Sequence, residues 1–234
     1  MSYDLPPTVH ISTHPCLQAK LSQLRQSTTN ARETKALVHE IALIVACEAT
    51  AAGLTSKKGD SAKTHLGYEY TTTTVSPGTI SVVPILRSGL GMLDAIQTLL
   101  PNPAPVHHLG LFREPTTLEP VEYYNNLPYH RPAANTPSDS PNSGASELAI
   151  LLDPVIATGG TCAAAIQTLK EWGVKKVIVI AILGALPGLQ KAANEWPEGV
   201  EIWVAGVDGE ITESGMIKPG LGDVGDRLFL TIGK

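Results

Sequence analysis

The sequence predicts an α/β protein in which helices flank a mostly parallel sheet. From residue 80 onward, short apolar runs typical of buried strands alternate with helical patterns, and such alternation favours a parallel sheet with right-handed crossovers. Residues 148–152 are apolar at every position, as expected for a strand covered on both faces. The 234 residues fit one large domain better than two small ones, and no internal repeat is present. We therefore expect a single domain over residues 1–234.

Helical patterns open the chain, and a polar stretch follows them. Leu17, Leu21 and Leu24 recur at helical spacing, and a longer helical pattern covers residues 33–52, with Gly53 at its end. Residues 55–78 are rich in Thr, Ser and Gly and show weak strand character at 71–74.

The alternating part of the chain then supplies the sheet and its helices. The predicted strands are residues 80–86, 106–112, 148–152, 176–183 and 201–207. The predicted helices are residues 92–100, 162–172 and 189–195. Thr161 is expected to cap the second of these helices, and Gly173 to end it. Residues 131–146, rich in Pro, Ser, Asn and Gly, are typical of a mobile surface insert.

Composition restricts the class of protein. Hydrophobic residues make up 43% of the chain and charged residues 17%, which is enough apolar material for a sizeable core. The net charge of −5, without a run of Lys or Arg, argues against a nucleic-acid partner. Three widely spaced cysteines suit reduced thiols rather than a disulfide framework or a zinc site. We find neither a signal peptide nor an apolar stretch long enough to span a bilayer, and we expect a cytoplasmic protein.

The most informative segment is ELAILLDPVIATGGTCAAAI, residues 147–166. In open parallel sheets, ligands bind beyond the carboxyl ends of the strands, where a helix N-terminus offers N–H groups to a phosphate. Gly159 and Gly160 let the backbone approach an anion closely, and the Thr158 and Thr161 hydroxyls can donate hydrogen bonds. The G-x-x-x-x-G-K-[ST] pattern of nucleoside triphosphatases is absent, which indicates a phosphate monoester.

Asp153 ends the strand that precedes this loop. A carboxylate at that point can accept hydrogen bonds from vicinal hydroxyls, as the acidic residue of a nucleotide site does. Phosphate and diol together indicate a ribose 5-phosphate. For this loop alone, an ordinary helix cap after a turn, with an Asp at the sheet edge, is an equally good interpretation.

Two other stretches strengthen the functional interpretation. VVPILRSGLGM, residues 82–92, places Arg87 at the carboxyl end of a strand, where its guanidinium could bind a diphosphate; a plain surface arginine is the alternative. IKPGLGDVGDRLF, residues 217–229, exposes backbone donors and acceptors that match a pyrimidine edge, although a tight surface turn would look the same. All three segments in one chain favour a binding site.

These motifs resemble those of a known family. The loop at residues 153–161 resembles the 5-phosphoribosyl 1-diphosphate (PRPP) signature of type I phosphoribosyltransferases, with Asp153-Pro154 where most members have two acids. Together with VVPILRSGLGM, LFREPTTLEPVEYY and PGLGDVGDRLF, it resembles uracil phosphoribosyltransferases over residues 14–231. The resemblance implies pyrimidine salvage by the reaction uracil + PRPP → UMP + diphosphate. It also implies Mg²⁺ as cofactor, held mainly through PRPP rather than by protein ligands.

The resemblance assigns roles to individual residues. Residues 157–161 would cradle the 5′-phosphate, Asp153 would bind the ribose hydroxyls, and Arg87 with Arg113 would hold the diphosphate. Asp223 would lie between base and PRPP, so the implied catalytic residues are Asp153, Arg87, Arg113 and Asp223. The implied PRPP site comprises Arg87, Arg113, Asp153, Pro154, Val155, Ile156, Ala157, Thr158, Gly159, Gly160, Thr161 and Asp223. The implied uracil site comprises Met216, Ile217, Gly222, Asp223 and Val224.

The resemblance also implies a mobile loop and a projecting β-arm after Arg113, enlarged by the 131–146 insert. It further implies a cis peptide near Leu86-Arg87, and a homodimer or homotetramer that binds small molecules and no membrane. GTP activates some members of the family, and no motif decides whether it acts here.

The chain departs from the family at a few positions. Gly215-Met216-Ile217 stands where the family has Gly-Tyr-Ile, and Phe229-Leu230-Thr231 stands where it has Phe-Gly-Thr. A different base is therefore one alternative. Another is a relative with little or no catalysis that senses UMP or PRPP and acts through a partner.

Overall fold

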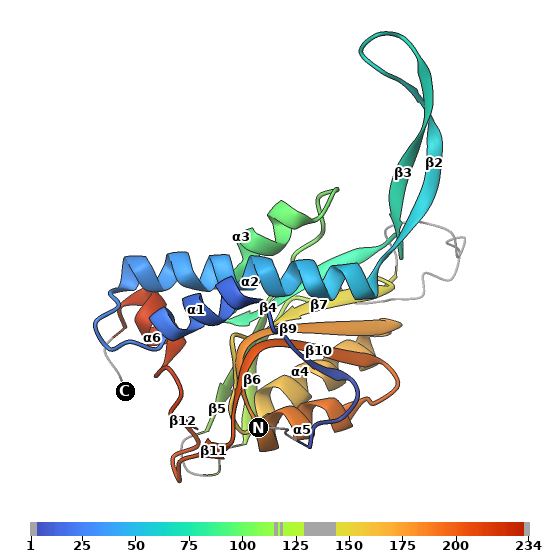
Figure 1. Cartoon of the computed structure of the whole chain (residues 1–234). Helices are drawn as coiled ribbons and strands as arrows, with labels where there is room; N and C mark the ends of the chain where they lie inside the picture. The colour runs from blue at the N-terminus through green and yellow to red at the C-terminus, as the bar shows by residue number, and fades with distance from the viewer. Residues whose placement is uncertain (1–3, 115–116, 118, 129–143, 232–234) are drawn as a thin grey trace.

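A central, mostly parallel sheet organises the protein in the computed structural model, which describes residues 4–114, 117, 119–128 and 144–231 (Figure 1). The strand order is β1-β10-β9-β7-β4-β5-β6, with β8 paired to β9, and only β6 runs antiparallel to its neighbour. This confirms the predicted fold class. The strands are β1 (Val9–Ile11), β4 (Ile80–Leu86), β5 (Leu109–Arg113), β6 (Pro120–Asn125), β7 (Leu148–Leu152), β8 (Val155–Ile156), β9 (Lys176–Ala185) and β10 (Val200–Asp208).

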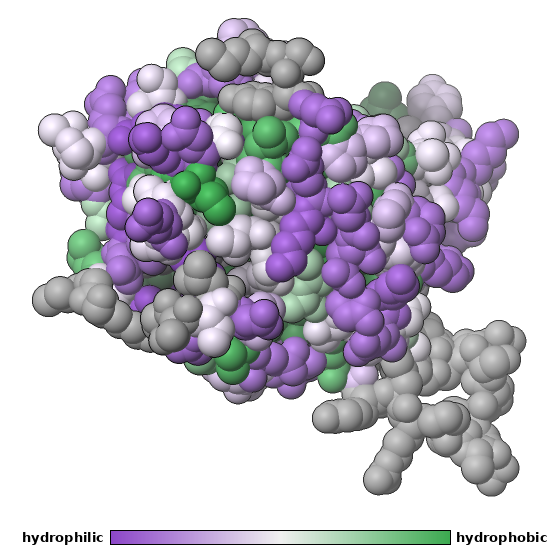
Figure 2. All heavy atoms as spheres, turned by 90° about the horizontal axis from the view of Figure 1, so that it is seen from below, coloured by the Kyte–Doolittle hydropathy of each residue, from purple (hydrophilic) through white to green (hydrophobic). Residues whose placement is uncertain are grey.

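Helices cover both faces of the sheet, so β7 is buried on each side. Leu148, Ile150 and Leu152 pack into the core beneath one group of helices, whereas Ala149 and Leu151 point into the other core. The first core is formed with α1 (Pro15–Leu24), α2 (Ala31–Gly53), α3 (Leu90–Leu99) and α6 (Val224–Phe229), and the second with α4 (Gly160–Trp172) and α5 (Leu186–Glu195). The side seen in Figure 2, from below the view of Figure 1, is mostly hydrophilic with scattered hydrophobic residues.

Helix α2 is the longest helix of the described chain, and it corrects one expectation. It begins with a capping box in which Asn30 accepts from the Glu33 backbone and the Glu33 carboxylate accepts from the Asn30 backbone. Contrary to the prediction, it is long and apolar enough by composition to cross a membrane. Its apolar side, which includes Val38, Ile41 and Val45, is fully buried against the sheet and its neighbouring helices, so packing in the core accounts for that composition.

The predicted strands 80–86 and 148–152 are confirmed at both ends. Gly173 ends α4 in a left-handed conformation, as predicted, but Thr161 is not its N-cap. The cap is Gly159, because the chain turns into the helix through a left-handed residue. Strand β5 begins at Leu109 rather than at residue 106, since Val106 makes only an isolated bridge to Val82.

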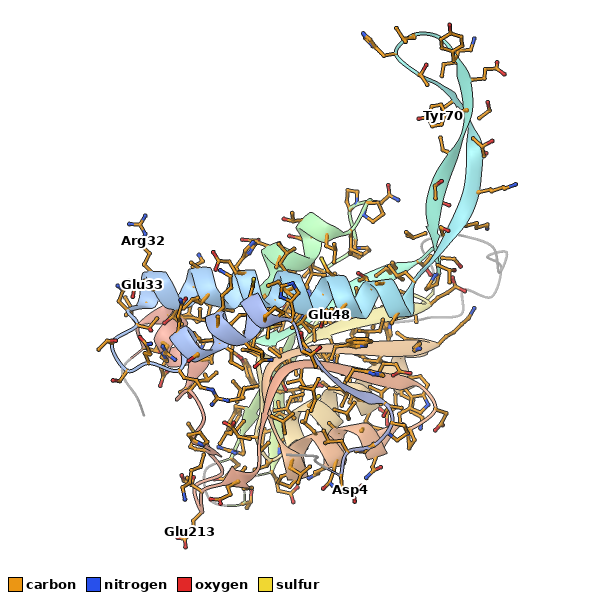
Figure 3. All side chains as sticks on the ribbon, viewed as in Figure 1. Asp4, Arg32, Glu33, Glu48, Tyr70 and Glu213 are labelled. Carbon is orange, nitrogen blue, oxygen red and sulfur yellow. The ribbon has the colours of Figure 1, made fainter. Side chains whose placement is uncertain are left out.

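The projecting arm lies elsewhere in the chain than the resemblance implied. Strands β2 (Thr55–Lys63) and β3 (Glu69–Ser76) pair antiparallel and extend from the body as a long hairpin (Figure 1), on which Tyr70 is labelled in Figure 3. Residues 120–125, expected in the arm, instead form β6 at the edge of the central sheet. Both faces of the hairpin are largely exposed, so it carries no alternating apolar pattern that would have predicted it strongly.

Three other expectations concern separate parts of the chain. Most of the 131–146 insert lies outside the described residues, which resume at residue 144. The Leu86-Arg87 peptide is cis, as the resemblance implies. All three cysteines lie in the described part of the chain and are free thiols.

Candidate active site

A cavity of about 360 Å³ lies at the carboxyl ends of the middle strands. It unites segments that are far apart in the sequence: the end of β5, the loop between β7 and α4, and the segment from residue 215 to residue 225. The predicted site residues that line it are Arg113, Asp153, Val155, Ile156, Ala157, Thr158, Gly159, Thr161, Met216, Ile217, Gly222, Asp223 and Val224. Most of the site expected from the sequence is therefore a single cavity.

The loop before α4 turns sharply at Gly159, whose φ is 77°. A Cβ at this position would lie 2.3 Å from the Gly188 carbonyl oxygen, and a Cβ on Gly188 would lie 2.2 Å from the Ala157 carbonyl oxygen. The loop therefore packs backbone to backbone against the start of α5, which leaves no room for a side chain at either glycine. The first N–H groups of α4 have no partner within the helix and suit an anion.

Asp153 lies at the end of β7 with only 6% of its surface exposed. Burial raises the pKa of its carboxyl to about 7, although a hydrogen bond from the Val155 backbone N–H acts in the opposite direction. Burial, together with the charge of Asp153, also raises the pKa of the Cys162 thiol. Near neutral pH, Asp153 can be protonated or ionised, and a ligand hydroxyl that donates to it would favour the ionised form.

Arg113 joins the carboxyl end of β5 to the hairpin of β11 (Glu210–Ile211) and β12 (Ile217–Lys218). Its Nη1 donates to the Gly215 carbonyl oxygen at 2.9 Å, and its Nη2 donates to the Ser214 carbonyl oxygen at 3.3 Å. A Cβ on Gly215 would lie 3.2 Å from Cγ2 of Thr158. This turn therefore also adjoins the loop at residues 157–161, here called the phosphate-type loop. The positively charged guanidinium of Arg113 thus lies where the phosphate-type loop adjoins the β11–β12 hairpin.

Arg87 lies outside this cavity and lines an adjoining one of about 690 Å³. The two cavities share Ser88, Asp223 and Gly225. The Nη2 atom of Arg87 lies 3.4 Å from Oδ1 of Asp226, which also accepts a hydrogen bond from the Thr231 hydroxyl. The two predicted diphosphate ligands therefore line neighbouring spaces connected at Asp223.

The expected base-binding segment also lines the cavity. Asp223 caps α6 by accepting a hydrogen bond from the Asp226 backbone N–H at 3.0 Å. Met216 is 36% exposed, and its backbone is held by Thr212, whose N–H donates to the Met216 carbonyl oxygen at 2.7 Å. Glu213, at the turn of this hairpin, points away from the body in Figure 3.

Besides Arg87, two predicted site residues do not line the cavity, and these two line neither space. The Pro154 carbonyl oxygen accepts hydrogen bonds from Ile182 and Leu183 and so supports the sheet. Gly160 adjoins α5 instead: a Cβ there would lie 3.7 Å from Nζ of Lys191.

Several neighbours of the site were missed. Lys191, on α5, brings a positive charge beside the loop, and nothing in its local sequence indicates this, because its position depends on how α5 packs. The missed residues that line the cavity are Ser88, Cys162, Leu183, Gly215, Pro219, Leu221 and Gly225. Five of these directly follow or precede predicted site residues, and that adjacency could have identified them: Ser88, Cys162, Gly215, Leu221 and Gly225.

The part of the chain that the structure describes contains no cluster of three His, Cys, Asp or Glu side chains suited to holding a metal ion. Asp153 and Asp223, the two carboxyl groups of the cavity, would have to share any cation with ligands from outside the protein.

The sheet order, the phosphate-type loop after the middle strand and the acid beneath it define the fold of a type I phosphoribosyltransferase. The solved adenine phosphoribosyltransferase of Trypanosoma brucei, in complex with AMP, pyrophosphate and ribose 5-phosphate, shares this fold at 18% identity with a TM-score of 0.51; the match covers 95% of this chain and 92% of that one. The structure of the AQ2163 protein from Aquifex aeolicus is more similar, at 30% identity and a TM-score of 0.81, over 94% of this chain and 97% of that one.

Sequence comparison identifies the family. A model of the uracil phosphoribosyltransferase family matches residues 11–231. The uracil phosphoribosyltransferase of Thermoanaerobacter sp. (strain X514) is 39% identical, and the match covers 95% of this chain and 98% of the relative. The chain belongs to the uracil phosphoribosyltransferase family.

Proposed function

We propose that the protein is an active uracil phosphoribosyltransferase, which converts uracil and PRPP to UMP and diphosphate in pyrimidine salvage. The observation that carries the proposal is the convergence, in one cavity, of the buried Asp153, the loop at residues 157–159 and the segment at residues 216–224. The substrates present a phosphate, a ribose diol and a planar base, and each of these groups needs its own binding segment. The family membership indicates which reaction takes place there.

In this proposal the loop binds the 5′-phosphate. The N–H groups at the start of α4, the Thr158 and Thr161 hydroxyls and the positive end of the helix dipole all favour an anion. The ammonium group of Lys191 beside Gly160 adds a positive charge on the same side. Asp153 accepts hydrogen bonds from the ribose hydroxyls, and these bonds favour its ionised form.

The reaction replaces the anomeric C–O bond to diphosphate with a C–N bond to uracil, whose N–H proton is released. Little covalent help is needed, because the difficult steps are stabilising the departing charge and aligning the nitrogen. Arg87 and Arg113 would bind the diphosphate from the two adjoining cavities, with Asp223 between them and the base. Mg²⁺, bound mainly by PRPP oxygens and water, would neutralise part of the diphosphate charge.

Uracil would be recognised by the backbone of residues 217–224 rather than by charged side chains. Ile217, Gly222 and Val224 line the cavity, and their backbone groups would offer fixed donors and acceptors to the base edge. Met216 would contact the base region through a flexible thioether where the family has a tyrosine.

The assembly and its regulation are further parts of the proposal. A homodimer or homotetramer is supported by the projecting β2–β3 hairpin, near whose tip Leu66 is 83% exposed and Tyr68 is also exposed. Activation by GTP follows from the resemblance alone, and a cytoplasmic location follows from the sequence composition; both stay predictions.

The test is the formation of UMP from labelled uracil, PRPP and Mg²⁺, with Asp153→Asn and Arg87→Ala as the informative variants. Asp94→Asn and Arg32→Ala are the matched controls, because both side chains are exposed and line neither of the two cavities; Arg32 points outward in Figure 3. We expect product from the wild type and both controls, and a loss of at least a hundredfold in kcat/KM in the informative variants.

Other outcomes would identify the alternatives. PRPP binding by calorimetry without product from uracil, but with product from another base, would indicate a different base specificity. PRPP or UMP binding without product from any base would indicate a sensor. The absence of both binding and product would refute the proposal.

A further inference from the structure

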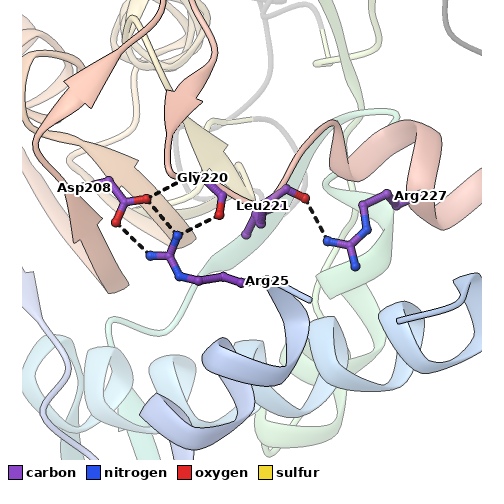
Figure 4. Close-up of polar contacts among 5 residues, drawn as sticks. All are labelled: Arg25, Asp208, Gly220, Leu221 and Arg227. Carbon is purple, nitrogen blue, oxygen red and sulfur yellow. Dashed lines mark hydrogen bonds and ion pairs between the residues drawn. The ribbon is translucent and has the colours of Figure 1, made fainter. Parts of the chain in front are cut away.

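An ion pair outside the cavity holds the backbone of the loop between β12 and α6 (Figure 4). The two guanidinium nitrogens of Arg25, at the end of α1, each donate to one carboxylate oxygen of Asp208 at 2.8 Å. Asp208 ends β10 and is only 7% exposed. A two-point pair of this kind fixes both side chains in one orientation.

Both partners of this pair also bond to Gly220. The Gly220 N–H donates to Oδ2 of Asp208 at 3.0 Å, and its carbonyl oxygen accepts from Nη1 of Arg25 at 2.7 Å. The backbone donor and the backbone acceptor of one residue are thus both held by the same ion pair. Gly220 has a φ of 66°, and a Cβ there would lie 2.2 Å from the Ile217 carbonyl oxygen, so the loop is tightly turned at this point.

A second arginine holds the next residue. Nη1 of Arg227, from α6, donates to the Leu221 carbonyl oxygen at 2.8 Å (Figure 4). The same nitrogen donates to the Leu24 carbonyl oxygen at 2.8 Å, which ties the loop to the end of α1. Nη2 of Arg227 lies 3.3 Å from the Thr34 hydroxyl of α2. The loop is therefore anchored to α1, α2, β10 and α6.

The neighbours of Gly220 in the chain form part of the cavity wall, whereas Gly220 itself and the anchoring side chains do not. Pro219, Leu221 and Gly222 line the cavity, next to the proposed base-binding residues. Arg25 and Arg227 instead line a separate hollow of about 510 Å³ on the other side of the same loop. Any change in the ion pair must therefore reach the cavity through the backbone of residues 219–222.

We propose that Arg25 and Asp208 are positioning residues, which fix the uracil-binding backbone from outside the cavity. This inference rests on the proposed function. Recognition by backbone groups needs a fixed loop, because a shift of a few tenths of an ångström lengthens several hydrogen bonds to the base at once. The phosphate-type loop is held separately, chiefly by its packing on Gly188, so loss of the Arg25–Asp208 pair should not change its position.

The test compares steady-state kinetics of Arg25→Met, Arg25→Lys and Asp208→Asn with the wild type. Lys20→Met is the matched control, because Lys20 also lies on α1 and pairs with Glu40 of α2 at 2.6 Å, away from the loop. We expect Arg25→Met and Asp208→Asn to raise KM for uracil at least tenfold and to change KM for PRPP less than twofold. Arg25→Lys, which keeps the charge but loses the two-point geometry, should be intermediate, and Lys20→Met should match the wild type.

A second measurement is independent of activity. Hydrogen exchange at the Gly220 amide, followed by NMR, should accelerate at least tenfold in Arg25→Met, while amides of β9 remain protected. Unchanged exchange at Gly220, or KM values for uracil and PRPP that rise together, would overturn the inference. A wild type that makes no UMP would refute the proposed function instead, and the exchange data would still decide whether the pair holds the loop.

Discussion

The buried carboxyl of Asp153 should make the protein less stable as the pH rises, and Asp153→Asn should remove this effect. Burial raises the pKa of Asp153 from 3.8 to about 7 in the folded chain. Between these values the folded state binds a proton that the unfolded state has released, so the free energy of unfolding falls with increasing pH. The stabilisation by the neutral carboxyl is fully present below pH about 4 and is lost as the pH rises through about 7.

The size of the effect follows from the pKa difference. The interval between 3.8 and about 7 corresponds to about 4 kcal/mol over the whole range, at about 1.4 kcal/mol per pKa unit. About 3 kcal/mol of this falls between pH 5 and pH 8. Asparagine has nearly the same shape and does not titrate, so the variant should lack this contribution and gain stability relative to the wild type as the pH rises.

The assay is urea unfolding of both proteins at pH 5, 6, 7 and 8, with the difference in the free energy of unfolding plotted against pH. All other titrating groups are common to the two proteins and cancel. A difference that grows by about 3 kcal/mol towards pH 8 agrees with the reasoning. A difference independent of pH would refute it, because the carboxyl would then have an ordinary pKa in the folded state. The same variant should lose UMP synthesis, since it cannot supply a carboxylate to the ribose hydroxyls.

Two further predictions concern the loop and the base. Gly159→Ala should raise KM for PRPP at least tenfold, because a methyl group would lie 2.3 Å from the Gly188 carbonyl oxygen and the left-handed φ costs about 1–2 kcal/mol besides. Gly67→Ala is the control, since Gly67 has a φ of 88° with open space around it; equal KM values for the two variants would contradict the packing argument. Met216→Tyr should lower KM for uracil, because a hydroxyl would then be available at the cavity wall; an unchanged or higher KM would count against this.

Local patterns predicted the sheet well where burial was complete. Strands β4 and β7 were predicted with their observed ends, because nearly every residue in them is apolar and turn-forming residues bound them. The hairpin of β2 and β3 was indicated only weakly, since a strand exposed on both faces has no apolar alternation. The cap of α4 was assigned to Thr161 on residue preference, but Gly159 takes that position because the loop must pass close to Gly188.

The sequence by itself determined the fold class and the composition of the loop at residues 153–161, since both depend on near neighbours in the chain. Only the tertiary structure decided what meets that loop. The order of the strands brings Arg113 to Gly215, and the packing of α1 on β10 brings Arg25 to Asp208, which is 183 residues away. Such contacts depend on which strands pair and on how helices pack across the sheet. No local pattern encodes that arrangement, because it is the outcome of burying all the apolar surfaces together.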